Sequence, residues 1–206
     1  MSEGFFSRGF RGRRQQNEQA GRIPPGQHLE RGFPVLSAGP TPHTPLDKWD
    51  FSIEGTVKEP KRWTWNELLA QPHEMPTVDI HCVTTWTKLD TSWEGVSVDV
   101  LLQQVDYDPN VVKYVVAFSD GGYTTNIPLA DVQGGKAWIV FNYDEKPLAP
   151  EHGGPARLLV PHLYFWKSAK WIRGLRLVEK DTPGFWETLG YNNYGDPWKE
   201  QRYWGD

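Results

Sequence analysis

Apolar and polar residues alternate most clearly in "WDFSIEGTV" (49–57), which reaches a glycine at its end and predicts a strand followed by a turn. The β-branched, apolar run "TVDIHCVTTW" (77–86) predicts a buried strand that ends near Cys82. "KYVVAFSDGGYTTNIPLADV" predicts two strands joined at Gly121–Gly122, and "AWIVFNYDEKPL" predicts a strand that turns at residues 144–146. The runs "ARLLVP" and "WIRGLRLVE" complete the expected strands.

Helical periodicity is confined to two short stretches. "TWNELLAQ" (64–71) has a cap candidate at Thr64 with Glu67 three residues later, the pattern of a capping box. "VSVDVLLQQV" (96–105) places four apolar residues at helical spacing. Strands outnumber helices and do not alternate regularly with them, so we expect an α+β fold of mixed sheets with short helices.

Three stretches lack periodicity. Residues 1–32 form a polar, basic region that we expect to be a flexible arm preceding one domain at 33–206. Arg13 and Arg14 are followed by the polar "QQNEQAGRIPPG" rather than by an apolar segment, which argues against an export signal and favours a cytoplasmic protein. The proline-rich segment 33–45 should be extended and irregular, and the aromatic C-terminal 25 or so residues should wrap over the domain.

Composition narrows the class of ligand. A chain of 206 residues is long enough to bury one sizeable core without disulfides. A formal net charge of -4 gives no general reason to bind nucleic acid, and no apolar run approaches the roughly 20 residues of a membrane span. Eleven Trp and 17 Pro indicate a loop-rich fold with large aromatic side chains. We therefore expect a small-molecule partner.

The single cysteine, Cys82, is open to three interpretations from its surroundings. It could be a small buried hydrophobic residue, which is the common role of a lone intracellular cysteine. It could be a nucleophile with His81 or His152 as base, although adjacent residues on a strand point to opposite faces. It could also be a thiolate ligand to a soft metal.

A candidate anion site lies in "EHGGPARLLVPHLYFWKSAKW" (151–171). Two glycines permit close backbone approach, and four side chains could clamp an anion: His152, Arg157, Lys167 and Lys170. The chain has neither a P-loop nor a Gly-x-Gly-x-x-Gly fingerprint, so a nucleotide-binding fold has little support.

Four stretches in this order resemble the molybdopterin-binding domain of the sulfite oxidase family: "HCVTTWTKLDTSWEGV", "EHGGPARLLVP", "KSAKWIRGLRLVE" and "GFWETLGYNNYGDPW". The chain looks most like the small bacterial and archaeal members, over residues 33 to the C-terminus. The resemblance implies a strand-rich sulfite oxidase fold around a molybdenum-molybdopterin cofactor.

The resemblance also assigns roles to residues. Cys82 matches the thiolate that ligates molybdenum, and Tyr191 matches an active-site tyrosine that would hydrogen-bond the reacting oxygen. The residues that would bind the cofactor are His43, Asp120, His152, Arg157, Ser168, Ala169 and Lys170.

The substrate site departs from that of animal and plant sulfite oxidases. Thr84, Thr85 and Lys88 stand where those enzymes carry arginines for an anionic substrate, although Lys88 could still attract an anion as a catalytic residue. The chain also lacks their dimerisation and haem domains, which implies an external one-electron redox partner protein. We therefore expect an oxidoreductase that transfers an oxygen atom to or from a small molecule, as a sulfite oxidase or an S-oxide reductase does. The alternatives are a catalytically silent pterin-binding or interaction module and a thiol hydrolase that uses Cys82.

Overall fold

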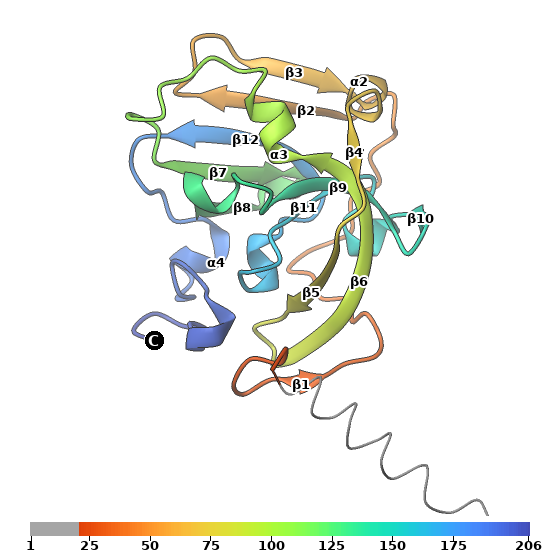
Figure 1. The fold of residues 1–206 in the computed structure, drawn as a ribbon, viewed down its shortest axis with the longest axis vertical. Coiled ribbons are helices and arrows are strands. Elements are labelled where there is room, and N and C mark those ends of the chain that lie inside the picture. The colour runs from red at the N-terminus through yellow and green to blue at the C-terminus, as the bar shows by residue number, and fades with distance from the viewer. Residues whose placement is uncertain (1–20) are drawn as a thin grey trace, which may run out of the picture.

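The computed structural model describes residues 21–206, which form two mixed sheets (Figure 1). The five-stranded sheet has the order β3-β2-β12-β7-β8 and comprises β2 (Asp50–Gly55), β3 (Lys61–Thr64), β7 (Tyr114–Ser119), β8 (Thr124–Pro128) and β12 (Ile172–Val178). The seven-stranded sheet comprises β1 (His28–Leu29), β4 (His73–Glu74), β5 (Thr77–His81), β6 (Trp86–Ser97), β9 (Trp138–Tyr143), β10 (Lys146–Pro147) and β11 (Arg157–Leu159).

The predicted strand positions agree with the structure in both sheets. β7 and β8 form an antiparallel hairpin whose connection contains Gly121 and Gly122 at φ +78° and +81°, a conformation that glycine adopts without strain. β12 lies between β2, to which it is parallel, and β7, to which it is antiparallel. The five-stranded sheet thus joins residues from both halves of the chain.

The strand that links the two ends of the seven-stranded sheet, β6, was not predicted. It has 12 residues and pairs with β1 and β5 in its first part and with β4 and β9 in its last part. Figure 1 shows it as a long curved strand. Gly95 permits its close approach to β9, because a Cβ there would lie 2.3 Å from the carbonyl oxygen of Ile139.

Helices are short and few within residues 21–206. α2 (Trp65–Leu69) begins at the predicted capping box, in which Thr64 and Glu67 satisfy each other's backbone N–H groups. α3 (Val98–Leu102) lies inside the second predicted helix, and α4 (Phe185–Thr188) follows β12. The short 3-10 helices are Asp120–Gly122, Leu129–Asp131, Pro150–His152, Phe165–Lys167 and Pro197–Lys199. The expected α+β fold is confirmed.

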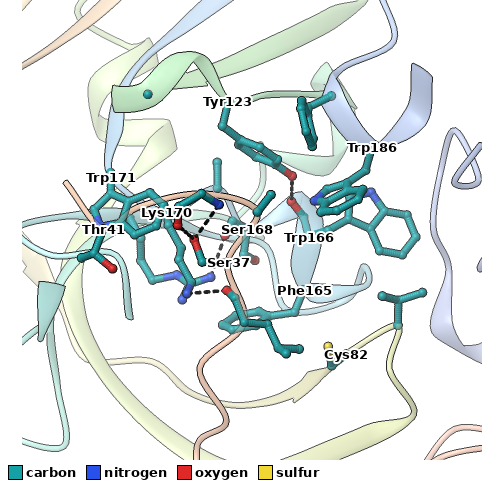
Figure 2. Close-up of a pocket in the computed structure, with 18 of the residues that line it drawn as sticks. Ser37, Thr41, Cys82, Tyr123, Phe165, Trp166, Ser168, Lys170, Trp171 and Trp186 are labelled. Carbon is teal, nitrogen blue, oxygen red and sulfur yellow. Dashed lines mark hydrogen bonds between the residues drawn. The ribbon is translucent and has the colours of Figure 1, made fainter. Parts of the chain in front are cut away.

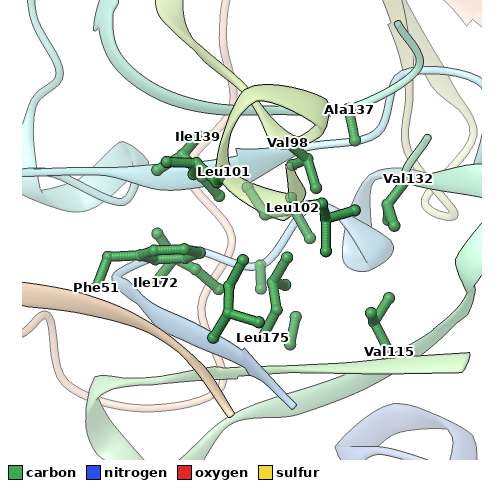
Figure 3. Packing of buried hydrophobic residues seen from close by; sticks show 14 of the residues in the cluster. Phe51, Val98, Leu101, Leu102, Val115, Val132, Ala137, Ile139, Ile172 and Leu175 are labelled. Carbon is green, nitrogen blue, oxygen red and sulfur yellow. The ribbon is translucent and has the colours of Figure 1, made fainter. Parts of the chain in front are cut away.

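The main core lies between α3 and the five-stranded sheet. Leu101 and Leu102 of α3 lie over Phe51 and Leu175 in Figure 3, and all four side chains are buried. Full burial of each such side chain contributes about 1.5–3 kcal/mol. A second buried cluster, rich in tryptophan, surrounds Cys82. No helix within residues 21–206 has the length and apolar character needed to cross a membrane.

Candidate functional site

A cavity of about 640 Å³ opens between the two sheets and the C-terminal segment (Figure 2). Its volume is in the range of small-molecule and cofactor sites. The lining residues belong to segments 33–42, 82–86, 120–123, 165–171 and 185–191, together with Arg157. The proline-rich segment 33–42 contains no helix or strand, as expected, and we call it the strap.

Cys82 lines this cavity at the turn that joins β5 to β6. Its backbone N–H donates to Trp86 O at 2.8 Å, and its carbonyl accepts from Thr85 N–H at 3.0 Å. Thr85 completes the turn at φ +72°. The cysteine is 7% exposed, and burial raises the pKa of its thiol. The sulfur lies 3.1 Å from Thr84 Oγ1.

Residues from the N-terminal segment form hydrogen bonds and ion pairs with this turn and with the strands that flank it. Gln27 Nε2 donates to Cys82 O at 3.0 Å, and Gln27 Oε1 accepts from Thr87 Oγ1 at 3.3 Å. Arg22 binds the carboxylates of Asp79 and Asp90. Residues 1–20 of the expected flexible arm lie outside the described residues, whereas these later ones contact β5 and β6. No sequence pattern points to Gln27, because a lone glutamine in a polar stretch has no distinctive signature.

Arg157 is a buried cation without an acidic partner among the described residues. It is 1% exposed, and its guanidinium donates to the carbonyls of His152 at 2.8 Å and Ser168 at 2.6 Å. The same group lies 4.0 Å from the centre of the Phe165 ring. Burial lowers its pKa to about 9. Since arginine carries five N–H donors, donors remain for a ligand in the cavity.

Lys170 adds a second cation on the cavity wall. Its Nζ donates to Leu36 O in the strap at 2.8 Å and to Glu151 O at 2.6 Å. Burial and, after it, the charge of Arg157 lower its pKa to about 8. Two buried cations whose pKa values are lowered, and whose hydrogen bonds within the described residues go to backbone carbonyls, form an environment that an anion would stabilise.

The opposite part of the cavity wall is aromatic. Tyr191 lies 5.0 Å from Trp186 and 5.1 Å from Trp166, measured between ring centres. Burial raises the pKa of Tyr191, so its hydroxyl stays protonated. In Figure 2, Trp186 and Cys82 lie toward one side of the cavity and Lys170 toward the other. In the sequence the tryptophans are informative only as a feature of the composition. Their role in the wall is not predictable, because three segments that lie far apart in the sequence supply the tryptophan side chains.

The predicted site residues fall into three groups. Cys82, Asp120, Arg157, Ser168, Ala169, Lys170 and Tyr191 line the cavity. His152 stacks on Phe33 of the strap at 3.9 Å, and its buried Nδ1 has no hydrogen-bond partner among residues 21–206; His43 lines a neighbouring pocket. Lys88 lies outside the lining, because its Nζ donates to Arg31 O at 2.6 Å.

The carboxylate of Asp120 already has partners within the chain. Its carboxylate accepts from Thr44 Oγ1 at 2.6 Å and lies 3.6 Å from a guanidinium nitrogen of Arg173. Within residues 21–206, no group of three or more His, Cys, Asp or Glu side chains could hold a metal ion. A metal beside Cys82 would therefore depend on ligands from outside the described residues.

Comparison with known proteins identifies the family. Residues 38–186 match the family described as oxidoreductase molybdopterin binding domain. This chain belongs to that family. The matched range includes Cys82, Arg157 and Lys170, and the expected membership of the molybdopterin-dependent oxidoreductases is confirmed.

Relatives of this molybdopterin-binding domain differ in length. Uncharacterized oxidoreductase YuiH of Bacillus subtilis is 39% identical over 196 residues, covering 95% of this chain and 98% of that protein. The MsrP catalytic subunit of protein-methionine-sulfoxide reductase from Ralstonia nicotianae is 26% identical over 163 residues, covering 71% of this chain. That match spans 49% of MsrP, about half its length.

A solved structure supports the fold. The sulfane dehydrogenase SoxCD from Paracoccus pantotrophus matches with a TM-score of 0.61 and 23% identity, over 68% of this chain and 40% of that chain. At this identity the likeness shows the fold alone. The family match, in turn, indicates molybdopterin as the cofactor of the domain.

Proposed function

We propose that this domain holds molybdenum-molybdopterin, with Cys82 as the one protein ligand to the metal, and reduces a neutral S-oxide by removing its oxygen atom. The main support is that one cavity has two distinct parts. One part is cationic and buried, at Arg157 and Lys170, and the other is aromatic, at Tyr191. The free thiol of Cys82 lies on the wall of the same cavity.

The donor set fits the cofactor. The terminal phosphate of molybdopterin would offset the unpaired charges of Arg157 and Lys170, which burial now disfavours. Trp86 Nε1 and His152 Nδ1 are buried at or near the cavity and have no partner in the described part of the chain, and ring atoms of a pterin could satisfy both. A soft thiolate suits molybdenum, and molybdopterin itself would bring the other sulfur ligands.

When bound, the cofactor supplies oxygen-atom transfer coupled to a two-electron change between Mo(VI) and Mo(IV). The net reaction takes one S-oxide, two electrons and two protons to one thioether and one water. We propose that an external carrier protein delivers the electrons one at a time. The Tyr191 hydroxyl would donate a hydrogen bond to the substrate oxygen, and the tryptophan rings would exclude water around it.

A neutral substrate is favoured over an anion such as sulfite. Among the described residues, the cations that line the cavity are Arg157 and Lys170, which we assign to the cofactor phosphate. Lys88, which the sequence suggested as an anion attractor, is held by the Arg31 carbonyl instead. The name of the relative MsrP, a methionine-sulfoxide reductase subunit, agrees with an S-oxide substrate. We also propose that the protein is located in the cytoplasm, as predicted from the sequence.

The thiol hydrolase alternative has less support. The hydrogen-bond partner of the Cys82 sulfur among residues 21–206 is the Thr84 hydroxyl, which cannot act as a base. The His81 ring instead contacts Thr87 Oγ1 through Nδ1 at 2.9 Å. Burial also raises the pKa of the thiol, opposite to what an activated nucleophile needs.

The test uses protein made in a host that synthesises molybdopterin. Wild type, Cys82→Ser and Cys82→Ala would be compared for molybdenum content, pterin content and reduction of dimethyl sulfoxide with a chemical electron donor. We expect pterin to be retained in both variants, with turnover lost, because a hydroxyl or methyl group is a poor ligand to a soft metal. Wild-type turnover in Cys82→Ala would exclude the ligand role, and wild-type protein without pterin would exclude the proposal as a whole.

A further inference from the structure

The hydroxyl of Thr84 lies within hydrogen-bond distance of the Cys82 sulfur, with Oγ1 3.1 Å from Sγ. Within the described part of the chain this hydroxyl makes no other hydrogen bond. In a free thiol either atom could be the donor. A thiolate bound to a metal has no hydrogen, so the Thr84 hydroxyl must then donate.

The turn holds this contact in place. Cys82 N–H is bound to Trp86 O, Cys82 O is bound by both Thr85 N–H and Gln27 Nε2, and β1 pairs with β6 directly after the turn. A β-branched threonine has few side-chain rotamers, so a fixed backbone also restricts its hydroxyl. The 3.1 Å contact is therefore a product of the turn rather than of a mobile side chain.

We propose that Thr84 is a positioning residue that donates a hydrogen bond to the Cys82 thiolate and thereby raises the reduction potential of the metal. This inference rests on the proposed function, in which Cys82 is the protein ligand. Reduction adds charge to the metal and its sulfur ligands, so a donor to sulfur stabilises the reduced state more than the oxidised one. Loss of the donor should lower the potential.

Three variants separate this role from a structural one. Thr84→Val removes the hydroxyl and keeps the branched shape, and Thr84→Ser keeps the hydroxyl. Thr85→Val is the matched control, since Thr85 lies next in the same turn and makes no side-chain hydrogen bond within residues 21–206, while valine keeps its branching at φ +72°. Each would be purified with its cofactor, and its molybdenum content measured.

The readouts are the midpoint potentials of the molybdenum, followed by the paramagnetic Mo(V) signal, and the coupling of that signal to an exchangeable proton. We expect Thr84→Val to bind wild-type amounts of molybdenum, titrate at lower potential and lose the coupling. Thr84→Ser should restore both properties, and Thr85→Val should match the wild type.

Two results would overturn the inference while leaving the proposed function intact. One is a Thr84→Val protein with the wild-type potential and proton coupling. The other is a Thr85→Val protein whose potential shifts as far, which would show a general effect of the turn. A Cys82→Ala protein with an unchanged Mo(V) signal would instead remove the metal-ligand role, and the inference with it.

Discussion

A buried ion pair anchors the C-terminal wall of the cavity. Lys167 Nζ lies 2.6 Å from Glu187 Oε1, and the two side chains are 0% and 1% exposed. The same carboxylate oxygen accepts from Thr125 Oγ1 at 2.8 Å and from Trp166 Nε1 at 2.9 Å. Because Glu187 directly follows Trp186, this pair fixes the aromatic wall to segment 165–171, which also lines the cavity.

The expected loss in the free energy of unfolding follows from the groups that remain after each substitution. Glu187→Gln keeps an oxygen for Thr125 and Trp166, but it removes the charge opposite Lys167. The new amide N–H₂ takes the place of Glu187 Oε2, which is buried without a partner. Burial already lowers the pKa of Lys167, and Glu187 partly opposes that shift. Removing one member of such a pair costs about 3–5 kcal/mol, a large part of the roughly 5–15 kcal/mol of a typical domain.

The assay is a double-mutant cycle by urea unfolding at pH 7. We expect Glu187→Gln and Lys167→Met each to lower the free energy of unfolding by about 3–5 kcal/mol. For a domain of this size this corresponds to roughly 6–20 °C in Tm. The double variant carries no charge at either position of this pair, so it should be less destabilised than the sum by about 2–3 kcal/mol.

An exposed pair in the same protein provides the control. Arg176 and Glu54 lie 2.8 Å apart, with side chains 53% and 34% exposed. Glu54→Gln should cost no more than about 1 kcal/mol, because solvent screens the pair. If Glu187→Gln cost as little as Glu54→Gln, or if the cycle were additive, the buried pair would not anchor the wall.

Three further predictions concern separate parts of the molecule. Arg157→Ala should lower pterin content more than it lowers turnover per bound molybdenum, which pterin and metal analysis would show; wild-type pterin content would contradict the phosphate role. Tyr191→Phe should slow S-oxide reduction about ten- to a hundredfold with unchanged molybdenum content, through loss of a hydrogen bond of about 1.4–3 kcal/mol. Burial lowers the pKa of His162 below its ordinary 6.5, opposed in part by Asp131, so the unfolded chain binds more protons and stability should fall as pH drops through that value. His162→Gln should reduce this slope in urea unfolding.

Strands with simple patterns were predictable, and β6 shows where the pattern fails. Lys88, Asp90 and Glu94 interrupt its apolar residues, and Asp90 has φ +55°. The pairing with β9 shifts register between Glu94 and Gly95, which breaks the two-residue period. The strand forms because partners on both sides supply its hydrogen bonds, and two of those partners, β1 and β9, lie far away in the sequence.

Sheet order was also beyond the local pattern. β2 and β12 are neighbours in parallel, with Ser52 opposite Gly174, although most of the chain separates them. Local propensity indicates that both are strands but not that they pair. The short helices were predictable because the capping box of α2 and the apolar spacing of α3 act within a few residues.

The resemblance placed Cys82, Arg157 and Tyr191 correctly on one cavity, while the local chemistry of each was visible only in the structure. The sequence could not show that Arg157 lacks an acidic partner among the described residues. Nor could it show that Lys88 donates a hydrogen bond to the Arg31 carbonyl. Both facts depend on the backbone of distant segments. They favour a neutral substrate under the proposed function, in which the cations on the cavity wall would bind the cofactor phosphate.

The construction of the cavity couples cofactor binding to the stability of the chain's outer segments. The strap is held to the wall by Lys170, whose amine also belongs to the anion-binding part. The aromatic wall is held by the ion pair between Lys167 and Glu187, and Lys167 lies three residues before Lys170 in the sequence. A cofactor that offsets the charges of Arg157 and Lys170 would therefore strengthen the segment to which both walls are attached. The same argument explains why a domain with a small helical content can still present a defined site: buried charges and strand ends, rather than helices, position its walls.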